Sequence, residues 1–94
     1  MKITKGQRLR IRREMGGERA TVWIGKEGAT EQVLKEVERQ LEKYEVVKVK
    51  LLRSVLRLEG RDYLARRIAH LTDSTLIEVR GNTLVLYKPR KKRI

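Results

Sequence analysis

Two glycines three residues apart, Gly25 and Gly28, enclose Lys26 and Glu27 in the stretch VWIGKEGAT. Neither glycine carries a Cβ atom, so this part of the backbone can approach another backbone closely. A helix that begins after Thr30 would add unpaired N–H groups and a partial positive charge. These groups and the ammonium of Lys26 could hold a phosphate, although the carboxylate of Glu27 would repel it. The alternative is a tight turn between a strand and a helix, without a ligand.

Positive charge gathers at the two ends of the chain. The net charge is +12 over 94 residues. Residues 1–14 hold six basic residues against one acid, residues 88–94 hold five against none, and the rest is nearly neutral. Basic ends of this kind suit a polyanion, most simply a nucleic acid, unless they serve only solubility. The candidate phosphate-binding residues at the two ends are Arg8, Arg10, Arg12, Arg13, Lys88, Arg90, Lys91, Lys92 and Arg93.

Catalysis has little support in the sequence. The absence of cysteine excludes disulfides, thiolate metal sites and a cysteine nucleophile. The one histidine, His70, has no carboxylate cluster near it in the sequence, and there is no Walker loop or dinucleotide fingerprint. We therefore expect a protein that is not an enzyme, with no cofactor, no metal and no small-molecule substrate. No apolar stretch could span a bilayer or act as a signal peptide, so we expect a cytoplasmic protein without a membrane partner.

The elements that position the Gly25–Gly28 loop follow from the spacing of apolar residues. Residues 20–24 are β-branched or aromatic, which predicts a strand with Val22 and Ile24 on one face and Trp23 on the other. Thr30 is a typical N-cap, which predicts that a helix follows it. The apolar face of that helix comprises Val33, Leu34, Val37, Leu41 and Tyr44.

The second half of the chain predicts another strand, another helix and a hairpin. Residues 45–52 alternate as a strand, and residues 62–72 carry apolar residues at helical spacing, namely Leu64, Ala65, Ile68 and Leu71. Two closing strands flank the turn Gly81-Asn82, in a register that pairs Arg80 with Thr83. This register predicts one face with Ile77, Val79, Leu84 and Leu86, and an opposite face with Leu76, Glu78, Val85 and Tyr87.

The order strand–helix–strand–helix–strand–strand predicts an α/β fold, a compact two-layer domain with a four-stranded mixed sheet. We expect one domain over residues 1–94, with a basic N-terminal segment at 1–19, a core at 20–88 and a basic tail at 89–94. The pattern leaves open whether residues 5–15 form a helix or a strand. RLRIR alternates like a strand, whereas Ile11 and Met15 are spaced like a helix face.

One face of the predicted sheet combines aromatic and basic residues. Trp23, Lys48, Lys50, Val85 and Tyr87 lie opposite the main apolar set. Such a face can stack bases and hold phosphates. The alternative, which we favour, is that the N-terminal segment covers it and makes Trp23 and Tyr87 part of the core. Two arginines of the second helix are further candidates for phosphate contacts, namely Arg66 and Arg67.

The stretches VWIGKEGATEQVLKEVERQLEKYEVVKVKLL and IEVRGNTLVLYKP resemble the CRM domain, the chloroplast RNA splicing and ribosome maturation module with a stand-alone YhbY-like form. The resemblance covers about residues 4–90. It implies a fold similar to the C-terminal domain of translation initiation factor three, with an N-terminal helix. It also implies RNA binding through the GxxG loop and basic surfaces, with ribosomal RNA or large-subunit precursors as partners. The family loop is usually neutral or basic at its two central positions, unlike Glu27 here.

Two further hypotheses remain open on the sequence alone. A small basic DNA-coating protein of the chromatin type, with a related fold, would bind duplex DNA with similar affinity. A protein-interaction module whose charges serve only solubility would bind no nucleic acid near 0.15 M salt. Competition between structured RNA and duplex DNA separates these readings from RNA binding.

Overall fold

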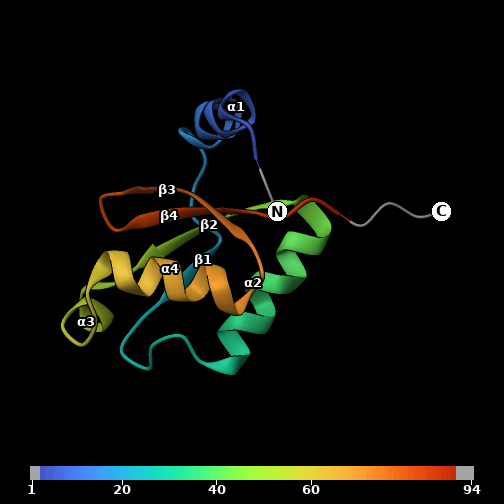
Figure 1. Cartoon of the computed structure of the whole chain (residues 1–94). Coiled ribbons are helices and arrows are strands. Elements are labelled where there is room, and N and C mark those ends of the chain that lie inside the picture. Colours follow the sequence, from blue (N-terminus) through green and yellow to red (C-terminus); the bar gives the residue numbers. More distant parts are fainter. Residues whose placement is uncertain (1–2, 91–94) are drawn as a thin grey trace.

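Four strands form one mixed sheet in the order β1-β2-β4-β3 (Figure 1). The computed structural model describes residues 3–90. The strands are β1 at Val22–Ile24, β2 at Val46–Leu51, β3 at Thr75–Arg80 and β4 at Thr83–Tyr87. β1 and β2 pair in parallel, and β4 runs antiparallel to both of its neighbours. β3 therefore runs in the same direction as β2, and β4 returns into the space between them.

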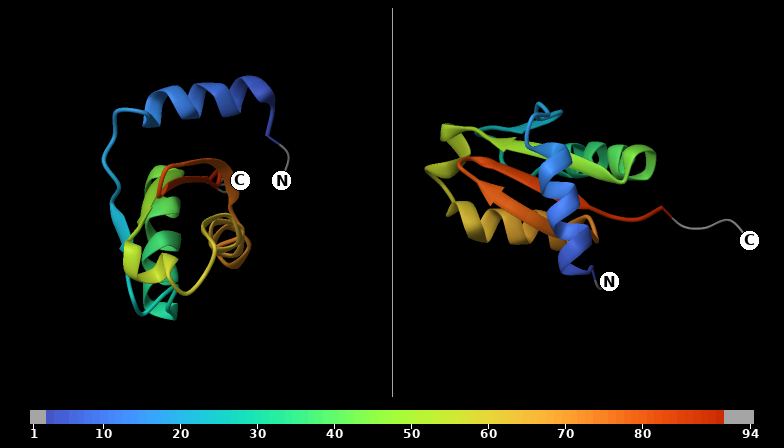
Figure 2. Two further views of the ribbon diagram at one scale, coloured as in Figure 1. Left: turned by 90° about the vertical axis from the view of Figure 1, so that its left-hand side faces the viewer. Right: turned by 90° about the horizontal axis from the view of Figure 1, so that it is seen from above.

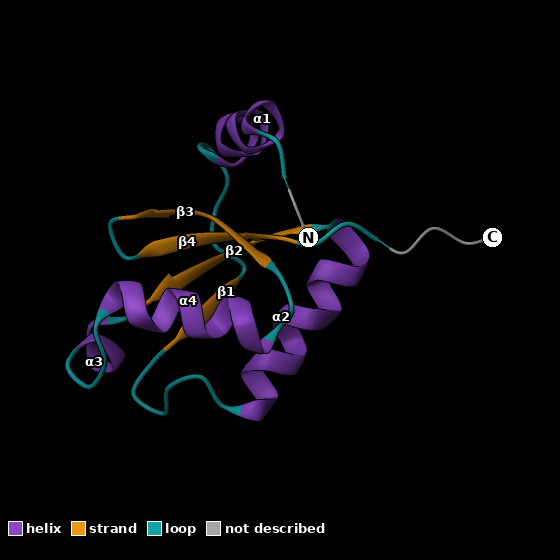
Figure 3. Ribbon diagram, in the orientation of Figure 1, coloured by secondary structure: helices purple, strands orange, loops and turns teal. Residues whose placement is uncertain are grey.

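Helices lie on both faces of the sheet (Figures 2 and 3). They are α1 at Lys5–Met15, α2 at Glu31–Tyr44, α3 at Arg53–Leu56 and α4 at Arg61–Leu71. α2 and α4 cover one face, and α1 crosses the other. The predicted α/β fold with a four-stranded mixed sheet is confirmed. Residues 5–15, which the pattern left open, form the helix α1, and this helix covers part of the outer face, as we expected of the N-terminal segment.

The main core fills the space between the sheet and the helices α2 and α4. It includes Val22, Ile24, Val37, Leu41, Val47, Val49, Leu51, Leu64, Ile68, Leu84 and Leu86. Two residues that we expected on the buried helix faces, Tyr44 and Leu71, are 61% and 47% exposed. Each is the last residue of its helix, where the apolar stripe runs past the core. Ala69 is buried in α4, and Gln40 is buried in α2, where its amide donates to Glu36 Oε2 at 2.8 Å.

A β-bulge in β3 changes which of its side chains face the core. The predicted pairing of Arg80 with Thr83 is confirmed, but the register shifts between Leu76 and Glu78. A bulge inserts one residue into a strand and therefore reverses the alternation beyond it. Leu76 consequently packs against the main core, and Ile77 lies in the cluster beneath α1. The predicted faces of these two residues were wrong.

α1 is held on the sheet by apolar packing and by one arginine. Ile11, only 2% exposed, packs in a second cluster with Ile77 and Val85. The guanidinium of Arg8 donates from Nη1 to the carbonyl oxygens of Leu76 and Ile77, at 2.8 Å each. These two carbonyls flank the bulge, so Arg8 satisfies backbone acceptors of the interrupted ladder.

The first turn of α1 carries a reciprocal cap. The Thr4 hydroxyl oxygen accepts from the Gln7 amide N–H at 3.0 Å, and Gln7 Oε1 accepts from the Thr4 N–H at 2.9 Å. This capping box satisfies two N–H groups that a helix start would otherwise leave unpaired. It favours a helix in a segment whose apolar residues are sparse.

Candidate nucleic-acid interface

The Gly25–Gly28 loop is a closed turn in which the two glycines differ. The Gly28 N–H donates to the Gly25 carbonyl oxygen at 2.8 Å. Gly28 has a φ of +77°, and a Cβ atom there would meet nothing within 4 Å, so this side of the loop faces open space. A Cβ atom on Gly25 would instead lie 3.5 Å from Leu52 Cδ1 and 3.7 Å from Ser54 Oγ. Gly25 thus faces α3, and only Gly28 leaves the loop open to a ligand.

Some N–H groups of this region are already used. The Thr30 N–H donates to the Gly28 carbonyl at 3.0 Å, and the Thr30 hydroxyl oxygen accepts from Val33 N–H at 3.2 Å, which confirms Thr30 as the N-cap of α2. The N–H groups of Gly28 and Thr30 are therefore engaged inside the protein. Within residues 3–90, no hydrogen bond engages the N–H groups of Lys26, Glu27, Ala29, Glu31 and Gln32. These five donors are available to an anion.

The two charged side chains of the loop are exposed and oppose each other. Neither Lys26 nor Glu27 has an ion-pair partner in the described part of the chain. The loop itself therefore contributes little net charge. Its backbone donors, rather than its side chains, distinguish it as a place for a phosphate.

The basic residues of α1 are partly engaged within the protein. Arg8 binds the carbonyls beside the bulge, Arg12 Nε lies 3.1 Å from Glu78 Oε1, and Arg10 Nε lies 3.8 Å from Glu14 Oε1. Arg13 is exposed and has no such partner among residues 3–90. Exposed ion pairs contribute only about 0–1 kcal/mol, so Arg10 can exchange its carboxylate for a phosphate at little cost, whereas the Glu78 carboxylate that Arg12 contacts is only 12% exposed. Arg8 is the least available of the three, because it holds α1.

Residues 88–90 follow β4 at the end of the sheet opposite the loop (Figure 1). Lys88 Nζ lies 3.8 Å from Asp73 Oδ2, and Arg90 Nε lies 3.4 Å from Glu45 Oε1. Glu45 ends α2 in the left-handed conformation, with a φ of 66°. Its carbonyl oxygen also accepts from Lys88 N–H at 2.9 Å, which fixes this segment to the corner between α2 and β2. The remaining predicted residues, Lys91, Lys92 and Arg93, lie outside the described residues.

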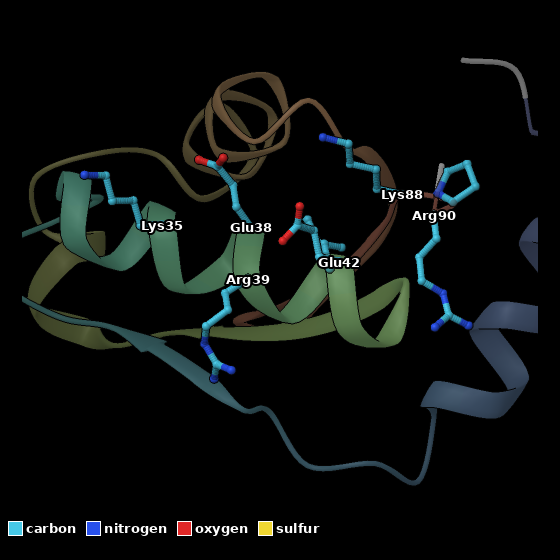
Figure 4. A pocket seen from close by; sticks show the side chains of 8 residues that line it. Lys35, Glu38, Arg39, Glu42, Lys88 and Arg90 are labelled. Atoms are coloured by element: carbon cyan, nitrogen blue, oxygen red, sulfur yellow. The ribbon is translucent and has the colours of Figure 1, made fainter. Parts of the chain in front are cut away.

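A charged groove runs between α2 and residues 88–90 (Figure 4). Its volume is about 670 Å³, and its charged lining residues are Lys35, Glu38, Arg39, Glu42, Lys88 and Arg90. On the same helix, the guanidinium of Arg39 binds Glu36 through two bonds of 2.7 and 2.9 Å. These bonds, and a third from Gln40, lower the pKa of Glu36 to about 2. The groove mixes both signs of charge, which gives it no strong preference for a polyanion.

The sheet lysines have different environments. Lys48 Nζ donates to the carbonyl oxygens of Met15 and Glu18, at 2.9 Å each, and so holds the C-terminal end of α1. Two of its three donors are engaged there. Lys50 is exposed and has no hydrogen-bond or ion-pair partner within residues 3–90. On α4, which covers the opposite face, Arg67 pairs with Glu59 and Arg66 is exposed.

Three arginines that we did not single out from the sequence lie at the end of the sheet nearest the Gly25–Gly28 loop, namely Arg53, Arg61 and Arg80. Arg53 begins α3, the helix that Gly25 faces. Arg61 Nη1 donates to the Gly81 carbonyl at 2.9 Å, in the turn after Arg80. Lys26 and Lys50 belong to the same end, together with the acids Glu27, Glu31 and Asp62. The folding of the chain, and not any sequence motif, brings these cations together.

Trp23 is exposed, contrary to the favoured expectation. It is 57% exposed, whereas Val85 is buried and Tyr87 packs against the cluster beneath α1. α1 docks on β3 and β4, and β1 is the strand at the other edge of the sheet. The N-terminal segment therefore covers Tyr87 but does not reach Trp23.

Two classes of site do not occur in the part of the chain that the structure describes. Residues 3–90 contain no group of three or more histidine, aspartate or glutamate residues that could hold a metal ion. No described helix is both long enough and apolar enough to cross a bilayer.

Comparison with known proteins gives a consistent set of relatives. A model of the CRS1/YhbY (CRM) domain matches residues 3–88. A protein of Methanocaldococcus jannaschii, named as a probable RNA-binding protein, is 33% identical over 90 residues, which are 96% of this chain but only 66% of that protein. A probable RNA-binding protein of Bacillus subtilis is 32% identical over 69 residues, 73% of this chain and 70% of that protein.

The fold also has a solved counterpart. A Staphylococcus aureus protein, whose solution structure is described as that of a candidate RNA-binding protein, superposes with a TM-score of 0.79. The sequences are 26% identical, and the match covers 99% of this chain and 95% of that one.

Proposed function

The chain belongs to the CRS1/YhbY (CRM) domain family, and on this basis we propose that it is an RNA-binding protein whose partner is ribosomal RNA in precursors of the large subunit. The observation that carries the proposal is the match of one RNA-binding family over residues 3–88, nearly everything that the structure describes. The names of the two relatives agree with RNA as the ligand. The resemblance to YhbY-like members of the family supports the ribosomal target, and we extend the proposal to action in the cytoplasm.

The proposed contact begins at the Gly25–Gly28 loop. RNA backbone approaches the open side of Gly28, where the unpaired N–H groups of the loop and of the first turn of α2 donate to phosphate oxygens. Lys26 adds one positive charge, and Glu27 offsets it. The loop therefore sets the position of the backbone more than it sets the affinity.

The proposed source of affinity is the surrounding positive charge. At the loop end, Lys50 and Arg53 are exposed and have no ion-pair partner within residues 3–90. The basic ends of the chain add charges whose surface pairs are weak. If five cations neutralise phosphates of a single strand, the logarithm of the affinity falls with the logarithm of the salt concentration at a slope of about −3.5. Binding of this kind needs no catalytic group, and we propose that the protein acts by binding alone.

Competition binding tests the proposal. Labelled structured RNA from the large subunit is bound by the full chain at 0.15 M salt, and unlabelled duplex DNA of equal length competes. We expect structured RNA to win by at least tenfold. Equal or better competition by DNA would favour the DNA-coating alternative, and no binding at 0.15 M salt would favour a protein-interaction module.

Deletion of residues 90–94 tests the contribution of the tail. Each cation that contacted a phosphate contributes about 0.7 to the slope on a single strand, so the deletion should weaken binding and flatten the slope. The melting temperature should stay within the error of the wild type, because no core residue is removed. An unchanged slope would remove the tail from the mechanism. Crosslinking and sequencing of the RNA bound in cells would identify the target.

A further inference from the structure

Four side chains form a row across the outer face of the sheet, the face on which α1 lies. Trp23 of β1 pairs with Lys50 of β2, Lys50 pairs with Thr83 of β4, and Thr83 pairs with Arg80 of β3. Residues directly opposite one another on neighbouring strands point to the same face. With strands about 4.8 Å apart, the row is about 14 Å long. That length matches about four stacked nucleotides at about 3.4 Å each.

α1 leaves this row uncovered. The helix packs over Ile77 and Val85. Lys48, which lies two residues before Lys50 on the same face of β2, binds the carbonyl oxygen of Met15 at the C-terminal end of the helix. Seen from above, α1 crosses the strands and leaves one end of the sheet bare (Figure 2). Trp23 is 57% exposed there, and Lys50 is exposed beside it.

The row carries positive charge and no acid. Lys50 has no partner within residues 3–90, and Arg80 shares Glu78 with Arg12, at 3.2 and 3.1 Å. One carboxylate therefore pairs with two guanidinium groups, which leaves a net positive charge. Beside Arg80 and Thr83, the face has a hollow of about 90 Å³ that extends to Gly16 at the end of α1. An indole beside a lysine, in a row that ends at an arginine, can stack a nucleobase and bind phosphates of the same strand.

We propose that an unpaired RNA base stacks on Trp23, while Lys50 binds the adjacent phosphate and Arg80, at the far end of the row, binds a phosphate farther along the same strand. The proposal rests on the proposed function and adds a second contact to it. Trp23 precedes Gly25 by two residues, so a strand that leaves the Gly25–Gly28 loop reaches the indole after about 7 Å. The loop and the row then form one continuous path, from the loop over the end of the sheet onto its outer face.

The chemistry of the row favours RNA over a protein as its occupant. A lysine without a carboxylate partner is unfavourable at the centre of a protein interface, where lysine is depleted. Phosphate supplies the missing negative charge at Lys50 and Arg80. β1 has only three residues, which makes it a short edge for pairing with a second chain.

Trp23 is the only tryptophan of the chain, so its fluorescence reports on this site alone. The full chain is titrated with single-stranded 12-nucleotide oligouridine and oligoadenosine at 0.15 M salt, and affinity is measured in parallel by the anisotropy of labelled RNA. We expect quenching of the tryptophan at saturation. Trp23→Ala should weaken binding by about 5- to 150-fold, the usual effect of removing one stacking side chain. Trp23→Phe should stay within about threefold of the wild type, because it keeps a stacking ring.

Three controls make the result specific. Tyr63→Ala removes an aromatic that is equally exposed, at 58%, but lies on α4 behind the sheet, and it should leave the affinity unchanged. A 12-base-pair RNA duplex offers no unpaired base, so Trp23→Ala should not alter its affinity. Salt dependence separates the two roles, because Lys50→Ala should flatten the single-strand slope by about 0.7 and Trp23→Ala should leave it unchanged.

The outcomes separate this proposal from the proposed function. If the wild type binds RNA and Lys26→Ala weakens it, but RNA does not quench the wild-type tryptophan and Trp23→Ala leaves the affinity unchanged, the stacking site is overturned and RNA binding stands. Failure of the wild type to bind any RNA overturns both. A wild-type dimer in sedimentation that Trp23→Ala converts to a monomer, together with no quenching of the wild-type tryptophan by RNA, would assign the row to a second copy of the chain and overturn the proposal.

Discussion

Replacement of Gly28 by alanine tests the conformation on which the loop contact depends. Gly28 has a φ of +77°, and a Cβ atom there would meet nothing within 4 Å. The cost of the substitution is therefore backbone strain alone, about 1–2 kcal/mol for an L-residue in the left-handed region. Gly25→Ala is the matched control in the same turn. Its φ is not positive, and its Cβ atom would make an ordinary contact of 3.5 Å with Leu52, so we expect a change within about 0.5 kcal/mol.

Thermal and urea unfolding measure the difference. In a domain of this size, about 1 kcal/mol shifts the melting temperature by about 4–8 °C, so Gly28→Ala should lower it by about 4–16 °C. Gly81→Ala should behave similarly, because Gly81 has a φ of +58° in the turn between β3 and β4. Equal stability of the Gly25 and Gly28 variants would refute the reasoning, since it would mean that Gly28 is not held in the left-handed conformation.

RNA binding by the same variants tests whether the conformation of Gly28 is needed for function. Measured well below both melting temperatures, Gly28→Ala should weaken binding, because strain at Gly28 shifts the neighbouring N–H donors. Gly25→Ala should bind as the wild type does, because its methyl group points toward α3 and away from the ligand. Loss of binding in the Gly25 variant alone would place the RNA on the other side of the loop.

Three further predictions concern charge, packing and pH. Glu27→Lys should tighten RNA binding by about two- to threefold at 0.15 M salt for each phosphate about 7 Å away, as measured by the anisotropy of labelled RNA. The affinity of Glu27→Gln should lie between those of the wild type and Glu27→Lys. Unchanged affinity would mean that the loop does not contact the RNA. Ile11→Ala should lower the free energy of unfolding in urea by about 2–4 kcal/mol, because it leaves a cavity in the cluster beneath α1. Leu9→Ala, on the exposed side of the same helix at 46%, should lower it by less than about 1 kcal/mol. Hydrogen bonds from Arg39 lower the pKa of Glu36 to about 2, against an ordinary 4.5, and the ionised carboxylate therefore stabilises the fold above pH 4.5. That stabilisation should disappear as the pH falls toward 2. Glu36→Gln should flatten this part of the curve of unfolding free energy against pH.

Local signals were sufficient for much of the fold. Thr30 is the N-cap that its residue type predicts, and the turn at Gly81-Asn82 has the predicted register. Both depend on residues close together in the chain, where turn and cap chemistry decides. The helix at Lys5–Met15 carried a similar signal in the spacing of Thr4 and Gln7, the pattern of a capping box. Apolar periodicity alone did not show it, because Ile11 is the only buried residue of that helix.

The errors arose where distant parts of the chain meet. No residue type in β3 predicts the bulge at Ile77, which places Leu76 against the main core and Ile77 in the cluster beneath α1. Lys48 appeared to be a free sheet lysine, and its bonds to Met15 and Glu18 exist only because α1 docks beside it. The exposure of Trp23 has the same origin, since it depends on how far α1 extends across the sheet. A sequence read for local pattern lists the charged groups, but tertiary contacts decide which of them remain available to a ligand.

The order β1-β2-β4-β3 has a consequence for folding during synthesis. β4 is the last strand to be made, yet it lies in the interior of the sheet and pairs with both β2 and β3. Until residues 83–87 leave the ribosome, β2 and β3 have no common partner, and each presents an unpaired edge. Unpaired strand edges favour association with other chains. The sheet can therefore close only after nearly all of the described chain has emerged, so folding must be a late and concerted event rather than a stepwise one.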